Sequence, residues 1–526
     1  MKFLKYIFST LLLCFLAVST NAQDLLESEQ PEAVEHALYG WSSSLLGGWA
    51  MVGAPQKDIG NYQSAGSVLF YQKINNEWNI ALEASPLGIT DFANFGASVS
   101  LGYSDALIGA TGDHEGGILS GAVYAYEYND TTWLQTQKLK PSDVKAGTRF
   151  GVSVDLHESV AVIGANQANG SKEKTGAAYI FEKEDGVWTQ TAKLTAEDGS
   201  SHDYFGYSVT MVNESIIAVG AYNADGAADR TGVVYIFERE GDEEWQQTAK
   251  LYDIEGSPSD LFGYSITASN VYVVKSTALH NFGGFLYVGA PGTINENGKT
   301  GSVYLYQKSN DGSWVLNEEL IEASSKHDDH FGISIAASDY GGFYVGASRS
   351  SENSDSKTGT VYQYDIWPFF EETPNAEVNI ITITESGEFD NFGYQVAADE
   401  LTLLVSSPHA DEESITNSGK VFFFDYRFVS NEETPNENVV NYKLEQNYPN
   451  PFNPTTTLKY QVKDAGDVKL TVYNLLGQVV QILVNERKTT GAYSVNFDAS
   501  ALSSGFYFYK LEVNDFASVK KMMLIK

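Results

Sequence analysis

The chain has 526 residues, of which 33 are Lys or Arg and 68 are Asp or Glu, so its formal net charge is -35. Aromatic residues make up 13% of it and charged residues only 19%, which excludes intrinsic disorder for most of the chain. A protein this acidic is not expected to bind nucleic acid or anionic lipid, because binding to either requires clustered Lys and Arg.

Residues 1–22 have the pattern of a secretory signal peptide. Lys2 and Lys5 precede an apolar stretch at residues 7–18, and small residues follow before Gln23. The apolar stretch is too short to span a membrane. It holds Cys14, the only cysteine, so the mature chain is expected to lack disulfides and cysteine metal sites. No later apolar run reaches transmembrane length, and we expect no transmembrane segment in the mature chain.

A short unit recurs seven times after the signal peptide. Each copy opens with a Phe-Gly or Tyr-Gly pair, followed by a strand that ends in small residues, then a Gly-led aromatic strand. In five copies a turn and a Trp come next. The opening pairs are Tyr39-Gly40, Phe95-Gly96, Phe150-Gly151, Phe205-Gly206, Phe262-Gly263, Phe331-Gly332 and Phe392-Gly393. Four strands fit into each copy.

The repeat predicts an all-β fold. A single four-stranded sheet cannot bury both faces, whereas seven placed radially can pack on one another. We therefore predict a seven-bladed β-propeller with four-stranded blades at residues 23–428. A solenoid is the competing arrangement, but it would leave two end faces without cover.

The first and last copies predict a closed ring. Copy seven ends after residues 421–426 without a fourth strand. Residues 25–28 resemble residues 81–84 and stand equally far before their own copy's opening pair. We therefore predict that the N-terminal strand closes the last blade, which removes two exposed sheet edges.

These copies, at residues 24–428, resemble the FG-GAP repeats of the integrin alpha-subunit propeller. The resemblance implies a ligand-binding or adhesive role, although a fold alone does not define a function.

Calcium is the one cofactor that the sequence leaves open. Integrin propellers often hold it in an Asp-rich loop between the first two strands of a repeat, and this chain has only short connections there. The nearest match, Asn223, Asp225 and Asp229, lies between the second and third strands. It offers about three side chains where calcium takes six to eight oxygens, so a loop stabilised by Asx hydrogen bonds competes with this interpretation.

Acidic residues near the opening pairs are the other candidates. Asp recurs two residues before Phe-Gly, where a hydrogen bond to backbone N–H groups of the turn or a carboxylate rim that binds a ligand would explain it. With two loop neighbours, the candidate ligand residues are Asp198, Asp203, Asp260, Asp328, Asp329 and Asp390.

No catalytic residues can be named, because no nucleophile, base and orienting group occur together in a recognisable pattern. We expect a secreted binding or adhesion module whose loops engage an extracellular protein or glycan. A lectin with sugar sites between the blades is the alternative, and a polysaccharide-degrading enzyme is a further one. Copy five carries extra residues at 272–285, which are either a contact surface or a longer hairpin.

Residues 429–441 are polar and without pattern, as in a linker. Residues 442–526 differ from the rest in charge, with 10 Lys or Arg against 7 Asp or Glu, and alternate like a β-sandwich of short strands. Their Pro-rich start (residues 447–454), VYNLLGQVV, SGFYFYKL and the end KKMMLIK resemble the type A C-terminal sorting domain of the type IX secretion system. The resemblance implies handling by that machinery and a place outside a Gram-negative bacterium, released or on its outer surface. A generic immunoglobulin-like binding domain is the alternative.

Overall fold

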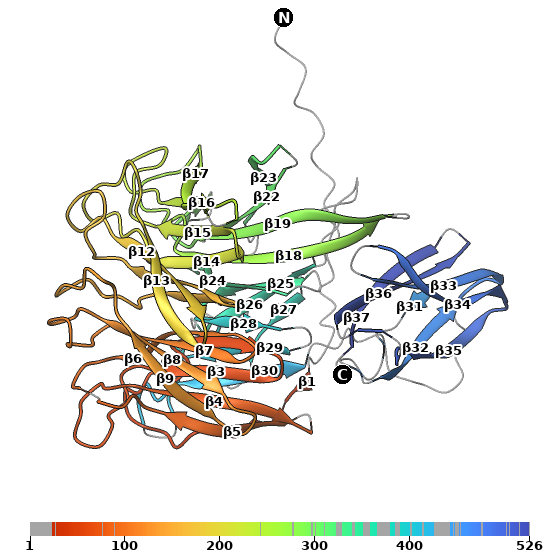
Figure 1. Ribbon diagram of the computed structural model, residues 1–526, viewed down its shortest axis with the longest axis horizontal. Helices are drawn as coiled ribbons and strands as arrows, with labels where there is room; N and C mark the ends of the chain where they lie inside the picture. The colour runs from red at the N-terminus through yellow and green to blue at the C-terminus, as the bar shows by residue number, and fades with distance from the viewer. Residues whose placement is uncertain are drawn as a thin grey trace, which may run out of the picture.

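The computed structural model describes residues 24–425 and 442–524 (Figure 1), with short gaps inside both ranges. The gaps are residues 27, 76, 89, 242, 276–277, 296–297, 300, 310, 322–328, 339–341, 351–357, 366–378, 384–389, 400–401, 413–414, 445–446, 448–451, 453, 475–476, 501, 504 and 515. The predicted signal peptide, residues 1–22, and the predicted linker, residues 429–441, lie outside the described residues.

Seven four-stranded antiparallel sheets follow one another along residues 24–425, numbered sheet 1 to sheet 7 here. In sheets 1 to 6 the strands lie side by side in chain order. Their strands, sheet by sheet, are β2 (Ser42–Leu46), β3 (Trp49–Ala54), β4 (Ser67–Ile74) and β5 (Glu77–Ala84); β6 (Phe95–Leu101), β7 (Asp105–Ala110), β8 (Ala122–Tyr128) and β9 (Trp133–Leu139); β10 (Val154–His157), β11 (Val160–Ala165), β12 (Ala177–Glu184) and β13 (Val187–Leu194); β14 (Ser208–Asn213), β15 (Ile216–Ala221), β16 (Val233–Glu238) and β17 (Gln246–Leu251); β18 (Ser265–Lys275), β19 (Ala278–Ala290), β22 (Ser302–Lys308) and β23 (Trp314–Leu320); and β24 (Phe331–Ala337), β25 (Gly342–Ala347), β26 (Thr360–Asp365) and β27 (Asn379–Ile381). A small two-stranded pair, β20 (Ile294–Asn295) and β21 (Gly298–Lys299), lies between β19 and β22.

Sheet 7 takes its outer strand from the start of the chain. It consists of β28 (Val396–Ala398), β29 (Thr402–Ser407), β30 (Lys420–Asp425) and β1 (Asp24–Leu25). β1 runs antiparallel to β30, with Asp24 opposite Asp425 and Leu25 opposite Phe424. The N-terminal strand therefore occupies the position that the sequence predicted for it.

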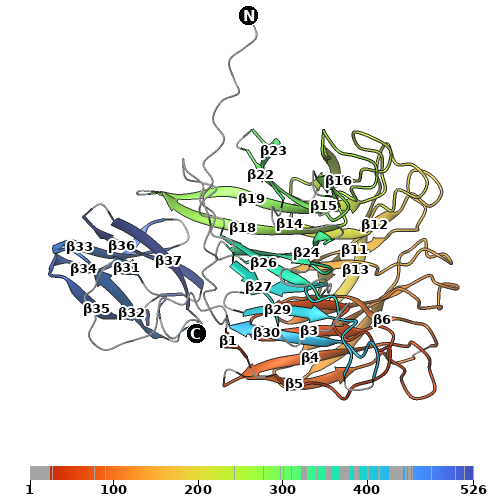
Figure 2. The same cartoon turned by 180° about the vertical axis from the view of Figure 1, so that it is seen from behind.

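The sheets form a ring, because the first strand of each sheet contacts the first strand of the next and β28 contacts β2. These first strands are the innermost ones. Figures 1 and 2 show the sheets side by side from two opposite directions. The predicted all-β class and the four-stranded units are confirmed.

The Phe-Gly pairs join one sheet to the next. The backbone N–H of Phe150 donates to the carbonyl oxygen of Ser120 in sheet 2 over 3.0 Å. Gly109 of sheet 2 lies so close to Gly151 that a Cβ on Gly109 would overlap the Gly151 carbonyl oxygen. The small residues at the strand ends are thus required by the close approach of neighbouring sheets.

A second hydrogen bond repeats around the inner strands. Ser98 Oγ donates to the carbonyl oxygen of Gly151 in the next sheet over 2.9 Å. Six sheets use a serine in this way, namely Ser42, Ser98, Ser153, Ser208, Ser265 and Ser334. In sheet 7 the position is Gln395, so the pattern changes at the seam of the ring.

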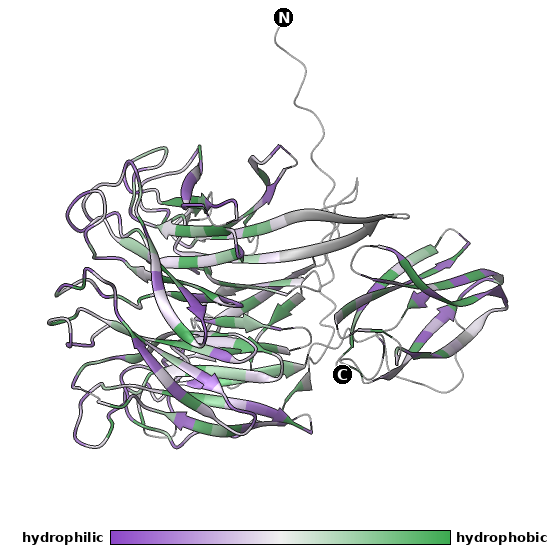
Figure 3. Ribbon diagram, in the orientation of Figure 1, coloured by the Kyte–Doolittle hydropathy of each residue, from purple (hydrophilic) through white to green (hydrophobic). Residues whose placement is uncertain are grey.

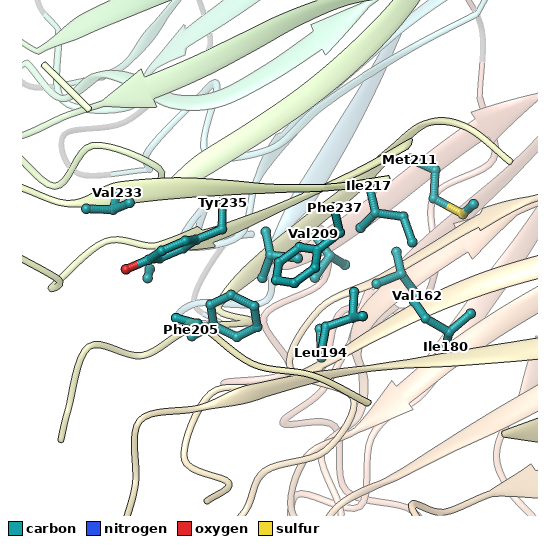
Figure 4. Packing of buried hydrophobic residues seen from close by; sticks show 14 of the residues in the cluster. Val162, Ile180, Leu194, Phe205, Val209, Met211, Ile217, Val233, Tyr235 and Phe237 are labelled. Atoms are coloured by element: carbon teal, nitrogen blue, oxygen red, sulfur yellow. The ribbon is translucent and has the colours of Figure 1, made fainter. Parts of the chain in front are cut away.

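The core lies between the sheets rather than at the centre of the ring. In one cluster, shown in Figure 4, Val162, Ile180 and Leu194 of sheet 3 pack against Phe205 and Ile217 of sheet 4. Hydrophobic residues concentrate on the inner three strands, and hydrophilic residues on loops and on outer strands such as β13 (Figure 3). Burial of apolar surface between sheets therefore holds the ring together.

Residues 442–524 form two sheets around a core of their own. Their strands are β31 (Lys443–Leu444), β32 (Thr455–Val462) and β35 (Gly491–Asp498) in one sheet, and β34 (Val479–Lys488), β33 (Gly466–Asn474), β36 (Gly505–Val513) and β37 (Phe516–Leu524) in the other. Within the described part of the chain, no helix has the length and apolar character needed to cross a bilayer.

Candidate binding site

The loops gather at one end of the ring, which we call the loop face (Figure 1). They connect the second strand of a sheet to the third and one sheet to the next. At the opposite end, β18 and β19 extend beyond the other strands as a hairpin. The predicted insertion at residues 272–285 therefore lengthens these two strands.

Five aromatic residues lie together on the loop face, and we call them the aromatic cluster: Trp41, Tyr207, Tyr222, Tyr264 and Tyr394. The ring centroids of Tyr207 are 4.5 Å from Tyr222 and 5.0 Å from Tyr264. Those of Trp41 and Tyr394 are 5.1 Å apart across the seam between sheets 1 and 7. All five residues are half-buried.

The cluster lies across the centre of the ring. Burial raises the pKa of the Tyr394 hydroxyl, and the charge of the Tyr264 hydroxyl raises it further. Burial likewise raises the pKa of Tyr207, with contributions from Tyr264 and Tyr394. Sheets 5 and 7 are not neighbours in the ring, so the electrostatic interaction between Tyr264 and Tyr394 acts across its centre. We call the centre of the loop face, where these tyrosines lie, the channel mouth.

Arg149 and His409 lie near the cluster, on different sides of it. The charge of Arg149 lowers the pKa of Tyr222 but is outweighed by burial and by nearby tyrosines, which raise that pKa to about 12. The centroid of His409 lies 6.0 Å from that of Tyr394. Burial and the charge of Arg349 lower the pKa of His409, and Asp390 partly opposes them.

The residue before each opening pair has a left-handed backbone. Its φ lies between 52° and 63° in all seven copies, although none of these residues is glycine; they are Leu38, Asn94, Arg149, Tyr204, Leu261, His330 and Asn391. Such a conformation is disfavoured for L-residues. It persists here because the next residue is held by its hydrogen bond to the preceding sheet, as Phe150 is by Ser120.

Two of the predicted ligand residues form the turn before Phe-Gly. Oδ2 of Asp203 accepts the N–H of Ser200, and Oδ2 of Asp260 accepts the N–H of Ser257, both over 2.6 Å. Both residues are buried. Burial raises the pKa of Asp203, and Asp225 and Asp198 add to this effect. The recurrence of Asp at this position therefore has the structural cause that the sequence predicted.

The remaining residues of this group are placed differently. Asp329 is buried, and its carbonyl oxygen accepts the N–H of Arg349 over 3.2 Å. Asp390 lies near His409, whose pKa it influences. Asp328 lies outside the described residues. A ligand-binding role for these three residues stays a prediction.

Asp198 belongs to a repeated polar contact between sheets. It lies in the loop between sheets 3 and 4 and accepts hydrogen bonds from Tyr235 Oη over 2.8 Å and Lys250 Nζ over 2.6 Å. Asp143 accepts equivalent bonds from Tyr179 and Lys193 one sheet earlier. The repetition indicates that this contact holds the loop between two sheets against the second of them.

Asn223, Asp225 and Asp229, the candidate calcium ligands, lie in the loop between β15 and β16. Oδ1 of Asp225 accepts the N–H of Arg230 over 2.9 Å, and Nδ2 of Asn223 donates to the carbonyl oxygen of His202 over 2.7 Å. Asp229 is exposed.

The same loop in sheet 3 forms with a neutral residue, because Oδ1 of Asn169 accepts the N–H of Lys174 over 3.1 Å. Asp225 therefore has the role of an Asx residue in a loop. No group of three or more His, Cys, Asp and Glu arranged to hold a metal occurs among the described residues. Calcium binding stays a prediction.

Sequence reasoning predicted the loop face but missed the aromatic cluster. Four of its members, Trp41, Tyr207, Tyr264 and Tyr394, stand two residues after the first residue of an opening pair. The same position holds Ala97, Val152 and Ile333 in the other copies. An aromatic residue at this position in four of seven copies was the available signal.

Comparison with known proteins identifies parts of the chain. Residues 133–181 and 188–237 match the model of the FG-GAP repeat, and residues 446–526 match that of the secretion system C-terminal sorting domain. No curated protein matches the chain.

Two solved structures also match the chain. The periplasmic gluconolactonase PpgL of Pseudomonas aeruginosa has 11% identity and a TM-score of 0.39, covering 81% of this chain and 94% of that one. The β-propeller domain of the Trilobed protease of Pyrococcus furiosus has 10% identity and a TM-score of 0.39, covering 73% and 95%.

Proposed function

Because the chain carries FG-GAP repeats and ends in a type IX secretion sorting domain, we propose that it is a secreted or cell-surface binding module whose ligand docks on the loop face. In this proposal the seven sheets are the blades of a seven-bladed propeller. The C-terminal sandwich is an immunoglobulin-like domain that the secretion machinery of a Gram-negative bacterium recognises. The ligand is an extracellular glycan or protein.

The aromatic cluster carries the proposal. Tyr and Trp offer large, rigid contact surfaces, and they dominate the energetics of many binding interfaces. Here five of them meet at the channel mouth and remain partly open to solvent. Loops held by a rigid scaffold surround them, which is a common arrangement for recognition sites.

The packing between sheets favours a sugar site at the channel mouth over one between the blades. A lectin with sites between the blades needs accessible space there, but buried side chains such as Val162 and Phe205 fill the interface between sheets 3 and 4. Aromatic stacking on a glycan is therefore better placed at the channel mouth than between the blades.

The test is a screen of the mature full-length protein on arrays of glycans and extracellular matrix proteins. Tyr264→Ala removes a ring from the centre of the cluster, and Tyr103→Ala removes one that is 68% exposed in the turn between β6 and β7, at the opposite end of the ring. We expect binding to at least one array ligand, weakened about tenfold or more by Tyr264→Ala and unchanged by Tyr103→Ala. Equal binding by both variants, at unchanged melting temperature, would refute the loop-face site.

A further inference from the structure

The two outer faces of the C-terminal sandwich, residues 442–524, differ in character. On the three-stranded sheet the side chains that point away from the core are polar. Thr457 and Lys459 on β32 lie opposite Asn496 and Ser494 on β35, and Lys459, Ser494 and Asn496 are exposed. A sandwich needs apolar side chains only on its two inner faces, and this sheet follows that rule.

The four-stranded sheet carries apolar side chains on both faces. We call six side chains on its outer side the outer apolar face: Tyr473, Val479, Ile482, Phe506, Phe508 and Met523. Tyr473 pairs with Val479 on one side and with Phe508 on the other. Phe506 pairs with Met523. Among the described residues, the core of this domain includes none of the six, so strand alternation places them on the outside.

The outer apolar face reaches an edge of its sheet. Val479 is 57% exposed and Ile482 is 47% exposed, and both lie on β34, which is an edge strand. Edge strands are usually protected by charged side chains or Pro. An exposed apolar patch that continues onto an unprotected edge is typical of a surface that a partner covers.

The identity of the domain indicates the partner. Residues 446–526 match the secretion system C-terminal sorting domain, and a sorting domain must present a surface to the machinery that exports it. Among the described strands, none in residues 24–425 makes an extensive contact with the sandwich, so the ring does not cover this face. Aromatic residues and Met are enriched in protein interfaces, whereas Lys and Ser are depleted. Of the two outer faces, only the apolar one meets this requirement.

We propose that the outer apolar face is the surface by which the type IX secretion machinery recognises the chain, and that it packs against an apolar patch on a protein component of that machinery. Val479 and Ile482 make the contact at the edge of the sheet, and Phe506 and Met523 continue it across the sheet. The polar face of the other sheet remains in water. This inference rests on the proposed secretion of the chain and names the surface responsible for it.

The test expresses the full-length chain in a Gram-negative bacterium that has a type IX system and measures the fraction of the chain outside the cell. Ile482→Lys places a charge in the outer apolar face, and Val479→Ser is a milder change at a more exposed position. Asn496→Lys, on the polar face of the other sheet, introduces the same charge and is the matched control. The melting temperature of each purified variant shows whether it folds, and Val479→Ser decides the question if Ile482→Lys melts early.

We expect Ile482→Lys to lower the exported fraction about tenfold and Val479→Ser about threefold, while Asn496→Lys is exported like the wild type. Normal export of both apolar-face variants would overturn the inference, and so would an equal loss of export in Asn496→Lys. A wild-type dimer that Ile482→Lys dissociates without a change in export would assign the face to a second copy of the chain instead.

The same purified proteins are applied to the glycan and matrix-protein arrays, where Ile482→Lys should bind like the wild type. Failure of the inference therefore leaves the proposed binding site on the loop face standing. Failure of the wild-type chain to leave the cell would instead refute the proposed secretion, and the inference with it.

Discussion

The backbone N–H of Leu26 donates a hydrogen bond to the carbonyl oxygen of Phe423 over 2.8 Å. The ring of Phe423 stacks on Trp78 of sheet 1 with centroids 4.5 Å apart, and Tyr39 hydrogen-bonds to Tyr71 nearby. The first described residues, the last sheet and the first sheet therefore meet in one buried cluster, which includes Leu26. This cluster is the seam of the ring.

Loss of the Leu26 side chain should weaken the seam. Leu26 is 7% exposed whereas its neighbour Leu25 is 57% exposed. We expect Leu26→Ala to lower the free energy of unfolding by about 2 kcal/mol or more, because it leaves a cavity in the seam. Leu25→Ala should change it by less than about 0.5 kcal/mol. Denaturant unfolding of both variants makes the comparison, and equal effects would argue against a packed seam.

A methyl group at Gly109 should disrupt the contact between sheets 2 and 3. The added Cβ would overlap the Gly151 carbonyl oxygen, which is backbone and cannot move away alone. We expect Gly109→Ala to cost about 3 kcal/mol. Gly342→Ala is the matched control, since its Cβ would meet nothing closer than 3.7 Å. Similar melting temperatures for the two variants would show that the sheets separate more easily than the geometry indicates.

The contact of Asp198 with Lys250 and Tyr235 should make stability depend on pH. Burial raises the pKa of Asp198, but the hydrogen bonds from Lys250 and Tyr235 outweigh it and hold that pKa below its usual value of 3.8. A carboxylate of this kind stabilises the fold above its unfolded pKa and loses the effect as the pH falls through its folded pKa.

Asp198→Asn should therefore cost about 0.5 to 1 kcal/mol at pH 7, a modest amount because solvent screens the contact. The difference from wild type should shrink as the pH falls below about 4. Asp185→Asn, in the exposed turn between β12 and β13, is the control. Urea unfolding at pH 7 and pH 3 measures both. A constant difference between wild type and Asp198→Asn would contradict the electrostatic origin.

The contribution of Glu214 and Glu158 to stability should depend on pH in the opposite direction. The two residues lie in the turns between the first two strands of sheets 4 and 3. A hydrogen bond that the protonated carboxyl group of Glu214 donates to Glu158 raises the pKa of Glu214, with smaller contributions from burial and the charge of Glu158. A carboxyl group with a raised pKa stabilises the fold below its unfolded pKa, and the effect is lost as the pH rises through the folded value.

Glu214→Gln should consequently be more stable than wild type at pH 7 and lose this advantage near pH 4. Glu158→Gln should do the same, and the double variant should add little, because either change removes the repulsion. Thermal unfolding at both pH values checks this. Fully additive effects would show that the two carboxyl groups do not interact.

The repeat made the general fold predictable. Phe-Gly pairs mark the start of each sheet, and the missing fourth strand after residues 421–426 indicated that Leu25 and Leu26 pair with the last sheet. Both features follow from the need to bury two faces of every sheet. The turn role of Asp203 and Asp260 was predictable as well, since recurrence in several copies favours a structural cause.

The channel mouth was harder to predict. Which side chains meet there depends on the inclination of the inner strands, and no local pattern reports that Tyr264 interacts with Tyr394 across the ring. The left-handed backbone at Arg149 and Tyr204 could not be predicted from the sequence for another reason. The contact of the following Phe imposes it, so the residue itself varies freely and carries no sequence signature.

The pairing of β1 with β30 also affects incomplete chains. A polypeptide that stops anywhere before Lys420 contains β1 but lacks the strand that receives it, and its last sheet presents an uncovered edge. Such fragments should associate with one another through that edge. A chain that includes β30 can close the ring and leave no such edge. We therefore expect it to stay monodisperse, whereas shorter chains aggregate.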